Sequence, residues 1–400
     1  MVSAWFRRPL FRLALAAAVA VAGFASATAP AAATPSVTAS VTQAPASADL
    51  SSVACSGPAA CVAVGDVAAG PWTTRTLAEA WTAGHWRVLP TPSPAATSSY
   101  LFGVTCRQSG GCVAVGAAIG GSGGWRALAM AWNGASWRLI PPIYPAGAES
   151  SELYGVSCGI PGTCLAVGSY ADPGGRTRPL AESLTGGAWR LLRPPAPAGQ
   201  VTASLNGVSC AGSGCLAVGS EHTGIGVAGV LAEAWTGGAW HLANPPGFGG
   251  SSAAAGQDVS CGAPGTCLMV GYAHRTNATA PLPIAEQFAA GQWRAAGHLA
   301  SAAALLSGVS CPSPARCVAV GNAYGTRRPG PIAQTWNGAA WRSYRPPAPA
   351  GPGVGYLSQV ACASPDSCLA VGGSYSAAGR RPLAETWNGV DWAMLAEPPA

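Results

Sequence analysis

Cysteine spacing divides most of this 400-residue chain into repeats. Fourteen cysteines form seven pairs, and the first members of successive pairs lie 50 to 52 residues apart. The pairs are Cys55/Cys61, Cys106/Cys112, Cys158/Cys164, Cys210/Cys215, Cys261/Cys267, Cys311/Cys317 and Cys362/Cys368. Self-similarity at a fixed period is the signature of an array of equivalent structural units. The chain therefore holds seven copies of a unit of about fifty residues.

Each repeat contains the same series of short apolar segments. In the second repeat, residues 101–106, 112–116, 128–132 and 137–140 read as four strands. An Asn-Gly dipeptide at 133–134 signals a hairpin between the last two. The last repeat follows the same scheme, and no segment has helical periodicity. Four short strands per repeat predict one blade of a β-propeller.

We therefore predict an all-β fold, a seven-bladed β-propeller with four antiparallel strands per blade. One small sheet cannot bury both of its faces alone, whereas seven sheets stacked around an axis bury them against each other. A β-solenoid is the alternative, but its rungs are usually shorter than this repeat. Blades are expected to start near residues 50, 101, 153, 205, 256, 306 and 357. The sequence leaves open whether an exchanged strand closes the ring.

The N-terminal residues have the features of a secretory signal peptide. A stretch with three arginines precedes an apolar run at 13–24, and small residues suited to cleavage follow at 25–27 and 31–33. The run of twelve is too short for a comfortable membrane span. We therefore expect a secreted, extracellular protein with no membrane span in its mature chain.

This leader sets the expected domain boundaries. We predict a signal peptide at 1–33, a flexible leader at 34–48 and a single propeller domain at 49–400. Export by the general or the twin-arginine route, and cleavage after Ala27 or Ala33, both stay open. Removing the three arginines lowers the formal net charge from +6 to +3. So thin a charge does not predict a nucleic-acid or anionic-membrane partner, and we expect a monomer.

The repeat resembles a known class of secreted proteins. Over residues 50–397, its Gly-Val-Ser-Cys, Cys-x-Ala-Val-Gly and Leu-Ala-Glu-x-Trp-Asn-Gly-x-x-Trp segments resemble those of secreted actinobacterial β-propeller repeat proteins. More distantly, the chain is similar to the BNR/Asp-box propellers, which include sialidases. Gly134 and Trp137 match the Asp-x-Gly-x-x-Trp turn of those proteins, but Trp132 stands in place of its Asp. The resemblance implies that the Gly-Val-Ser-Cys strand is innermost and the Trp-Arg strand outermost.

The cysteine pairs are predicted to be disulfides and not metal ligands. A zinc site needs four converging ligands, whereas each pair stands about fifty residues from the next. Two cysteines flanking a short hairpin loop in an exported protein favour a disulfide that fixes the register of the hairpin. Cys210 and Cys215 have one residue fewer between them, so we expect the most strain there.

Two further residue types recur at fixed positions of the repeat. A carboxylate occupies one position in five repeats, and Met130 and Gln334 replace it in the other two. We interpret these carboxylates as structural and expect arginines on the adjacent strand to neutralise them. They are Glu79, Glu182, Glu233, Glu286 and Glu385, with Arg87, Arg190 and Arg294 as partners. The recurring tryptophans are expected to pack between blades.

The segment between the second and third strands varies from repeat to repeat. Variable loops on a rigid scaffold are where binding usually occurs, so we predict a ligand site on the face that carries them. Tyrosine offers a large contact area with a polar tip. The predicted ligand-binding residues are Tyr170, Tyr272, Tyr324, Tyr375 and Trp125.

Three functions remain open at this point. The first is an extracellular, non-catalytic binding or interaction module whose partner is an unknown protein or glycan. The second is a carbohydrate-active propeller, either a lectin or a degenerate sialidase-like glycosidase. A glycosidase needs two nearby carboxylates, and the candidates at variable positions are Asp66, Asp172, Glu221 and Asp258. The third is a purely structural envelope protein. We predict no enzyme activity, no catalytic residues, no metal and no cofactor.

Overall fold

The computed structural model describes residues 47–94, 97–120, 123–195, 199–223, 228–245, 247–248, 251–276, 280–297, 299, 303–324, 329–349, 354–376 and 379–396. Over these residues the fold is all-β, with strands and turns and no helix. No helix among them could span a membrane.

Consecutive strands form antiparallel groups of four. The first groups are β1 (Ala48–Gly57), β2 (Ala60–Ala68), β3 (Thr74–Thr82), β4 (His85–Val88); β5 (Ser98–Cys106), β6 (Cys112–Ile119), β7 (Trp125–Trp132), β8 (Trp137–Leu139); and β9 (Ser150–Ile160), β10 (Thr163–Ala171), β11 (Thr177–Thr185), β12 (Ala188–Leu192). The middle groups are β13 (Gln200–Ala211), β14 (Gly214–Thr223), β15 (Ala228–Thr236), β16 (Ala239–Leu242); and β17 (Ser251–Ala263), β18 (Thr266–Arg275), β19 (Leu282–Ala289), β20 (Gln292–Ala295). The last groups are β21 (Ala304–Ser313), β22 (Arg316–Ala323), β23 (Gly330–Trp336), β24 (Trp341–Tyr344); and β25 (Val354–Ser364), β26 (Ser367–Ser376), β27 (Gly379–Trp387), β28 (Trp392–Met394).

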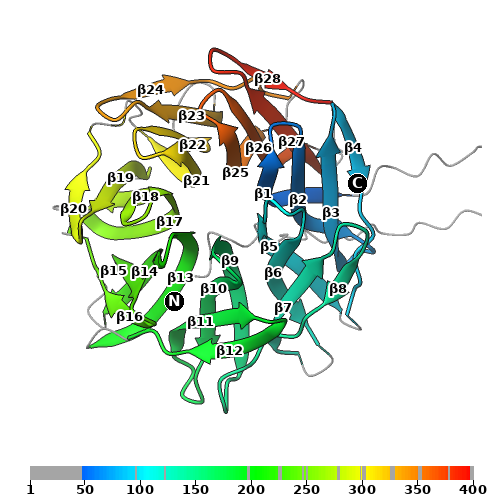
Figure 1. Ribbon diagram of the computed structural model, residues 1–400, viewed down its shortest axis with the longest axis vertical. Coiled ribbons are helices and arrows are strands. Elements are labelled where there is room, and N and C mark those ends of the chain that lie inside the picture. The colour runs from blue at the N-terminus through cyan, green and yellow to red at the C-terminus, as the bar shows by residue number, and fades with distance from the viewer. Residues whose placement is uncertain are drawn as a thin grey trace, which may run out of the picture. The chain divides into compact units, whose positions relative to one another are not determined.

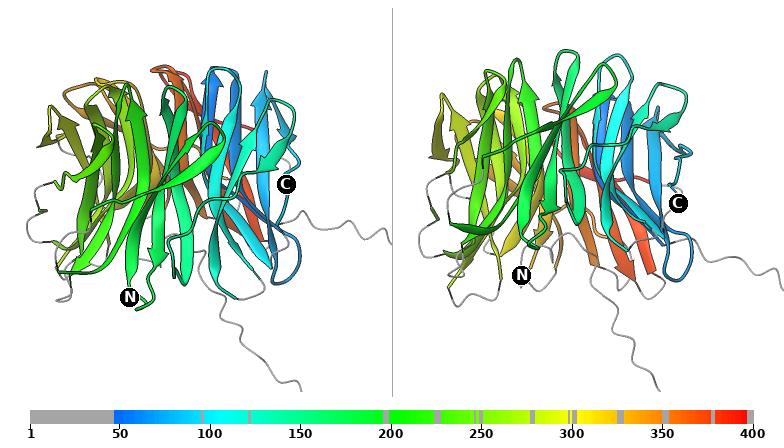
Figure 2. Two further views of the ribbon diagram at one scale, coloured as in Figure 1. Left: turned by 60° about the horizontal axis from the view of Figure 1, so that its bottom comes forward. Right: turned by 90° about the horizontal axis from the view of Figure 1, so that it is seen from below.

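These sheets form a ring around a central axis (Figure 1). The first strand of each group lies nearest the axis and the fourth lies at the rim, as the resemblance implied. In the side views of Figure 2 the sheets stand upright around the ring. Adjacent innermost strands contact each other, and β25 contacts β1 to close the ring. Each group consists of consecutive strands, so no exchanged strand closes the ring among the described residues. This is the architecture of a β-propeller.

A glycine near the middle of each second strand is required by a close backbone approach. The first strand of each group has a register shift at this level, as between Leu50 and Ser52 in β1. The shift brings the Asp49 carbonyl oxygen within 1.9 Å of where a Cβ of Gly65 would lie. Any side chain there would clash with backbone. The same close approach occurs at Gly116, Gly168, Gly219, Gly271, Gly321 and Gly372.

The turns between third and fourth strands follow two patterns. In the second group, Asn133 Oδ1 accepts hydrogen bonds from the amides of Ala135 and Ser136, each at 2.9 Å, and Gly134 has a positive φ of 98°. The hairpin predicted there is confirmed, because Trp132 and Trp137 pair directly. Other groups use two central residues with positive φ, as a type I′ turn requires. These pairs are Ala83-Gly84, Gly186-Gly187, Gly237-Gly238 and Ala290-Gly291.

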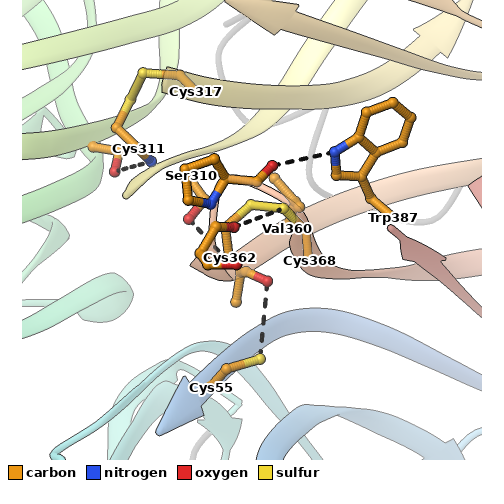
Figure 3. The surroundings of a disulfide bond; sticks show 12 residues. Cys55, Ser310, Cys311, Cys317, Val360, Cys362, Cys368 and Trp387 are labelled. Atoms are coloured by element: carbon orange, nitrogen blue, oxygen red, sulfur yellow. Dashed lines mark hydrogen bonds between the residues drawn. A yellow bond between two sulfur atoms is a disulfide. The ribbon is translucent and has the colours of Figure 1, made fainter. Parts of the chain in front are cut away.

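Seven disulfides link the first and second strands of the groups, as predicted. Each joins cysteines of one pair, with Cα atoms 3.8 to 4.1 Å apart. Figure 3 shows Cys362–Cys368 with its neighbours. The other six are Cys55–Cys61, Cys106–Cys112, Cys158–Cys164, Cys210–Cys215, Cys261–Cys267 and Cys311–Cys317.

The cysteines flank the short hairpin loop, and in several pairs the ladder continues beyond the disulfide. Cys61 and Cys267 lie inside the ladder, opposite Cys55 and Cys261, and pairing continues past them toward the turn. A register shift on the first strand accommodates the extra residue of the loop, so the backbone groups beyond the disulfide stay paired. Cys61 and Cys267 are also buried, at 4% and 5% exposed, and belong to cores between adjacent groups. These disulfides are therefore part of the core.

The short loop of Cys210–Cys215 does not distort its disulfide. The Cα separation there is 4.0 Å, which falls within the range of the other pairs. The shorter loop is accommodated because Cys210 and Cys215 pair directly and the ladder continues regularly to Ala211 and Gly214.

Adjacent groups share hydrophobic cores. One core combines Val113 and Val115 of the second group with Leu153, Leu180 and Trp189 of the third. The indole Nε1 atoms of three fourth-strand tryptophans also donate to a backbone carbonyl of the preceding group. These bonds run from Trp189 to Ile140 (2.8 Å), from Trp293 to Ala243 (2.5 Å) and from Trp341 to Ala296 (2.6 Å). The fourth-strand tryptophans therefore pack between blades, as expected.

The recurring glutamates are buried, but the expected arginine partners are wrong. Glu79, for example, is fully buried with neither oxygen hydrogen-bonded, and it pairs across the sheet with Val88 and not with Arg87. Neighbouring side chains on a strand point to opposite faces, so Arg87 points away from Glu79. Arg190 and Arg294 are offset from Glu182 and Glu286 in the same way. All three arginines are exposed.

Candidate functional site

A buried charge cluster joins the first and last groups of strands where β2 ends and β27 begins. Asp49 and Asp66 lie directly opposite each other on β1 and β2. Two like charges in such a pair destabilise a sheet unless a cation compensates them. Arg380 of β27 supplies it, with Nη2 2.7 Å from Asp66 Oδ2 and Nη1 3.5 Å from Asp49 Oδ2. The Tyr356 hydroxyl donates a hydrogen bond to Asp49 Oδ2.

Glycine and tyrosine at the end of β26 complete this cluster. Tyr356 pairs with Gly373, where a Cβ would lie 2.6 Å from Asp49 Oδ1 and 2.7 Å from the Tyr356 hydroxyl. The missing side chain at Gly373 therefore lets Tyr356 reach Asp49. Tyr375 stacks on Tyr356, with ring centroids 5.3 Å apart, and is 41% exposed. Tyr375 thus connects the cluster with the surface.

The two carboxyl groups differ in their environment. Burial raises the pKa of Asp49 to about 7, and the charge of Asp66 adds to this effect, while Tyr356 and Arg380 oppose it. Burial also raises the pKa of Asp66, but Arg380 opposes that shift through charge and a hydrogen bond. The cluster therefore holds a carboxyl group with a pKa of about 7 beside a second carboxyl group that is hydrogen-bonded to a guanidinium.

Six innermost strands carry a leucine at the same register position, which Gly256 occupies in β17, and the residue before this position differs sharply around the ring. In β25, β1, β5 and β9 it is Tyr356, Asp49, Tyr100 and Glu152, all half-buried. In β13, β17 and β21 it is a small or aliphatic residue that is buried: Ser204, Ala255 and Leu305. The four large polar residues follow one another on adjacent strands. We call them the polar arc.

Aromatic rings extend the polar arc across the second and third groups. Tyr100 lies 5.7 Å from Trp125 and 6.1 Å from Phe102, measured between ring centroids. Phe102 lies 5.8 Å from Tyr154, whose hydroxyl donates to Glu152 Oε2 at 3.1 Å. This end of the ring therefore offers ring faces and carboxylates side by side.

The structure brings together only part of the predicted site. Tyr375 stacks on Tyr356 of the polar arc, and Trp125 contacts Tyr100 of the same arc. Tyr170 packs into the core between the second and third groups. Tyr272 is half-buried and contacts His274, with ring centroids 5.4 Å apart. Tyr324 follows β22 directly, and its amide donates to the Ala303 carbonyl.

The prediction that these residues lie in loops is wrong for four of the five. Tyr170, Tyr272 and Tyr375 lie in second strands and Trp125 opens a third strand. The ladders continue past the Ala-Val-Gly segment because the backbone groups there stay paired across the sheet, as between Tyr170 and Arg178. Every innermost strand begins two to five residues before the residue near which its blade was expected to start.

Two of the four predicted carboxylate candidates have structural roles. Asp172 Oδ1 accepts the amides of Gly174 and Arg176 within its turn, and these bonds lower its pKa. Asp258 Oδ2 accepts from the Val309 amide at 2.9 Å and from Gln359 Nε2 at 3.0 Å. Asp66 lies beside a second carboxylate, Asp49. Its partner Asp49 was missed, although the variability one residue before the repeated leucine could have indicated it.

No cluster of three or more His, Cys, Asp or Glu suited to a metal ion occurs within the described ranges.

Comparisons with known proteins support the fold and nothing finer. No protein-family model matches the chain, and no curated protein matches it. A protein of unknown function from Dyadobacter fermentans is similar in structure, with a TM-score of 0.52 and 10% identity over 86% of this chain and 96% of that one. A polysaccharide lyase of family PL25, an ulvan lyase, gives 0.50 and 8% over 89% and 95%. The U3-55K protein gives 0.50 and 9% over 81% and 88%.

Together, the ring of four-stranded sheets and these neighbours define the protein as a β-propeller. Identities of 8 to 10% extend to the fold alone.

Proposed function

We propose that this protein is an extracellular, non-catalytic binding module on a seven-bladed propeller, and that its ligand binds over the polar arc. Each four-stranded group is taken as one blade, which agrees with one disulfide per repeat and with the contact between β25 and β1. The signal-like segment at 1–33, which lies outside the described residues, and the absence of free cysteines among the described ones support export to an oxidising compartment.

The asymmetry of the polar arc carries the binding proposal. Residues that only pack blades recur around the ring, because each blade packs in the same way. The polar arc instead breaks the repeat on four adjacent strands, and it combines tyrosines with acidic groups. Aromatic residues with a few convergent polar groups are typical of ligand sites. A single ligand without ring symmetry, a glycan or a segment of a protein, fits this arrangement.

Glycan and peptide arrays probed with the mature protein test this function. Tyr375→Ala should reduce binding to any ligand found by about tenfold or more, because the substitution removes an exposed ring beside the cluster. Tyr144→Ala is the matched control, since Tyr144 is 42% exposed and lies outside the polar arc. Equal losses in the two variants, or none in either, would remove the polar arc from consideration.

A carbohydrate-active propeller is the second candidate, and one observation favours it. Asp49, with a pKa of about 7, lies beside Asp66, which Arg380 holds in an ion pair. Acid–base catalysis of glycoside hydrolysis uses two neighbouring carboxyl groups that lie in different environments. We therefore expect any hydrolysis of fluorogenic glycosides to disappear in Asp49→Asn. Activity retained in that variant would assign catalysis elsewhere.

A further inference from the structure

The contact that closes the ring contains charged groups as well as a hydrophobic core. β1 contacts β25, β26 and β27 of the last group, and these strands lie side by side in Figure 1. We call this contact the closing junction. The contact between the third and fourth groups, which we call the reference junction, has a similar core, but its innermost strands are joined by a neutral bond from the Cys210 amide to Ser157 Oγ. A comparison of the two junctions therefore isolates the role of the charges.

Both junctions also bury one glutamate between blades. Glu79 lies in the closing junction and Glu233 in the reference junction, and each is fully buried with neither oxygen hydrogen-bonded. Burial raises the pKa of each to about 8. The two glutamates therefore add similar pH dependence to their junctions, and any excess at the closing junction comes from its other groups.

The charges of the closing junction do not balance when every group is ionised. Arg380 is the cation of the cluster, with Nη2 2.7 Å from Asp66 Oδ2 and Nη1 3.5 Å from Asp49 Oδ2. All three side chains are largely buried, with 7 to 15% of their surface exposed. One guanidinium balances one carboxylate, so ionisation of both aspartates leaves a buried negative charge without a counter-ion.

Asp49 is the aspartate that holds a proton more readily. Its Oδ1 atom is buried and has no hydrogen-bond partner within the described part of the chain. Backbone of Gly373 lies against this atom, since a Cβ there would be 2.6 Å away. Burial, together with the charge of Asp66, raises the pKa of Asp49 to about 7. Asp66 accepts the shorter hydrogen bond from Arg380, which opposes its protonation.

Five strands pack against β1 and carry the other ionisable groups of this region. These groups are Asp66 of β2, Tyr100 of β5, Tyr356 of β25, Tyr375 of β26 and Arg380 of β27. Burial and the charge of Asp49 raise the pKa of Tyr356, so its hydroxyl keeps its proton. A hydroxyl can donate or accept, so Tyr356 can bond to Asp49 in either protonation state, and an arginine stays charged. The proton on Asp49 is therefore the one that changes.

We propose that the cluster of Asp49, Asp66 and Arg380 is a pH-sensitive latch, which holds the closing junction shut while Asp49 is protonated and weakens when Asp49 is ionised. With the proton in place, the buried charges of Asp66 and Arg380 balance. Without the proton, a negative charge stays buried unless β1 separates from the last group and exposes it to water. The latch needs no ligand, so it goes beyond the function proposed for the polar arc.

The direction of the effect follows from the two states of Asp49. Between pH 3.8, the ordinary pKa of an aspartate, and pH 7, Asp49 is protonated in the closed junction but ionised once the junction opens. Opening then releases a proton, so the opening constant rises by up to about tenfold per pH unit. Above pH 7 Asp49 is ionised in both states, and the constant levels off. The stabilisation is therefore complete below pH 3.8 and is lost as the pH rises through about 7.

Hydrogen exchange of two backbone amides tests the latch, because each amide donates across a junction to a serine Oγ. The Arg380 amide donates to Ser47 across the closing junction, and the Cys210 amide donates to Ser157 across the reference junction, both at 3.0 Å. Exchange at pH 5 and pH 7.5, corrected for its intrinsic pH dependence, gives the opening constant at each amide. We expect the constant at Arg380 to rise at least about tenfold more than the constant at Cys210.

Two variants assign this excess to Asp49. Asp49→Asn keeps the shape of the protonated aspartate without its titration, so it should remove the excess and keep the Arg380 amide protected at pH 7.5. Asp172→Asn is the matched control, because Asp172 forms a more exposed ion pair with Arg178, and it should leave the excess unchanged.

Three results would overturn the proposal. They are an equal rise at the two amides, an excess that persists in Asp49→Asn, and an excess that disappears in Asp172→Asn. The first is measured on the unaltered protein, so the proposal is tested even if a variant does not fold. No ligand takes part in these measurements, so failure of the latch and failure of the polar arc to bind a ligand are separate results.

Discussion

Besides the shared cores and the indole hydrogen bonds, neighbouring blades are joined by polar contacts of two kinds, and these differ in chemistry. At four junctions a serine Oγ of one innermost strand accepts the amide of the next strand's cysteine at 2.9 to 3.0 Å. The pairs are Ser157/Cys210, Ser209/Cys261, Ser260/Cys311 and Ser310/Cys362, the last shown in Figure 3. We call these the serine junctions. At the closing junction, between the last and first groups, the equivalent residue is Ala361, and the charge cluster around Arg380 lies in the same interface.

The difference follows from chain connectivity. At each serine junction the two blades are also joined by a short covalent link and share a hydrophobic core, and at two of them an indole hydrogen bond adds to the serine contact. The closing junction joins strands from opposite ends of the domain, with Asp49 and Arg380 separated by more than three hundred residues. Its cohesion is entirely non-covalent. The charge cluster forms only when Asp49, Asp66 and Arg380 come within hydrogen-bonding or ion-pair distance, so it specifies which strands meet at this junction.

Removal of Arg380 should have the largest effect on this comparison. Arg380→Met keeps much of the apolar stem but leaves Asp49 and Asp66 buried without a cation. We expect the free energy of unfolding at pH 7 to fall by about 3–5 kcal/mol. Urea denaturation under oxidising conditions measures it.

The control for this variant is a more exposed ion pair. Arg178 and Asp172 are 3.1 Å apart, with side chains about a quarter exposed, so Arg178→Met should cost only about 0–1 kcal/mol. If both variants lose equally little, the cluster does not hold the closing junction. Adding Asp49→Asn and Asp66→Asn to Arg380→Met should recover part of the loss.

Buried glutamates allow the closing junction to be compared by pH with the junction between the second and third groups. Glu79 lies on the face of the first group that packs against the last group, has no hydrogen-bond partner and has its pKa raised by burial to about 8. Glu182 lies between the second and third groups, accepts the Ile143 amide at 3.0 Å and has a pKa raised by burial to about 7. At a pH between 4.5, the pKa of glutamate in the unfolded state, and these raised values, each glutamate is ionised in the unfolded state but still protonated in the folded state. Stability is therefore fully present below pH 4.5 and declines as the pH rises through the folded pKa.

Replacing these glutamates with methionine removes their titration. The second group already carries a methionine, Met130, at this position. Glu79→Met should raise the free energy of unfolding by about 1–3 kcal/mol at pH 8.5 and by less at pH 5. Glu182→Met should gain less, because it leaves the Ile143 amide without its partner. Thermal unfolding across this pH range measures both. A pH-independent gain would mean that packing, and not ionisation, limits the native protein.

Repetition explains why the fold could be predicted and the site could not. Seven equally spaced cysteine pairs defined the disulfides, and the Asn133-Gly134 turn defined a hairpin, because each depends on residues close in the sequence. The pairing of Arg380 with Asp66 spans the whole domain, and no local pattern indicates it. Glu79 pairs with Val88, so its side chain points to the face of the sheet opposite that of Arg87. The prediction that Arg87 neutralises Glu79 assumed a register that was wrong by one residue. Tyr170 lies in a strand because β10 continues beyond its apolar segment. The length of that strand depends on cross-strand pairing, which the apolar pattern did not indicate.

The smallest expected effect comes from converting the closing junction toward the serine type. Ala361→Ser places a hydroxyl one residue before Cys362, where Ser310 stands relative to Cys311. If its geometry matches, it accepts the Cys55 amide and raises the free energy of unfolding by about 0.5–1.5 kcal/mol, the net value of one hydrogen bond. Ser209→Ala is the reciprocal change and should cost about 1–3 kcal/mol, since it leaves the half-buried Cys261 amide without an acceptor. A gain from Ala361→Ser that persists in the Arg380→Met background shows that the two devices act independently. A loss from Ala361→Ser would mean that the cluster holds β1 and β25 at a different height from the serine junctions, so that the closing junction is distinct in geometry as well as in chemistry.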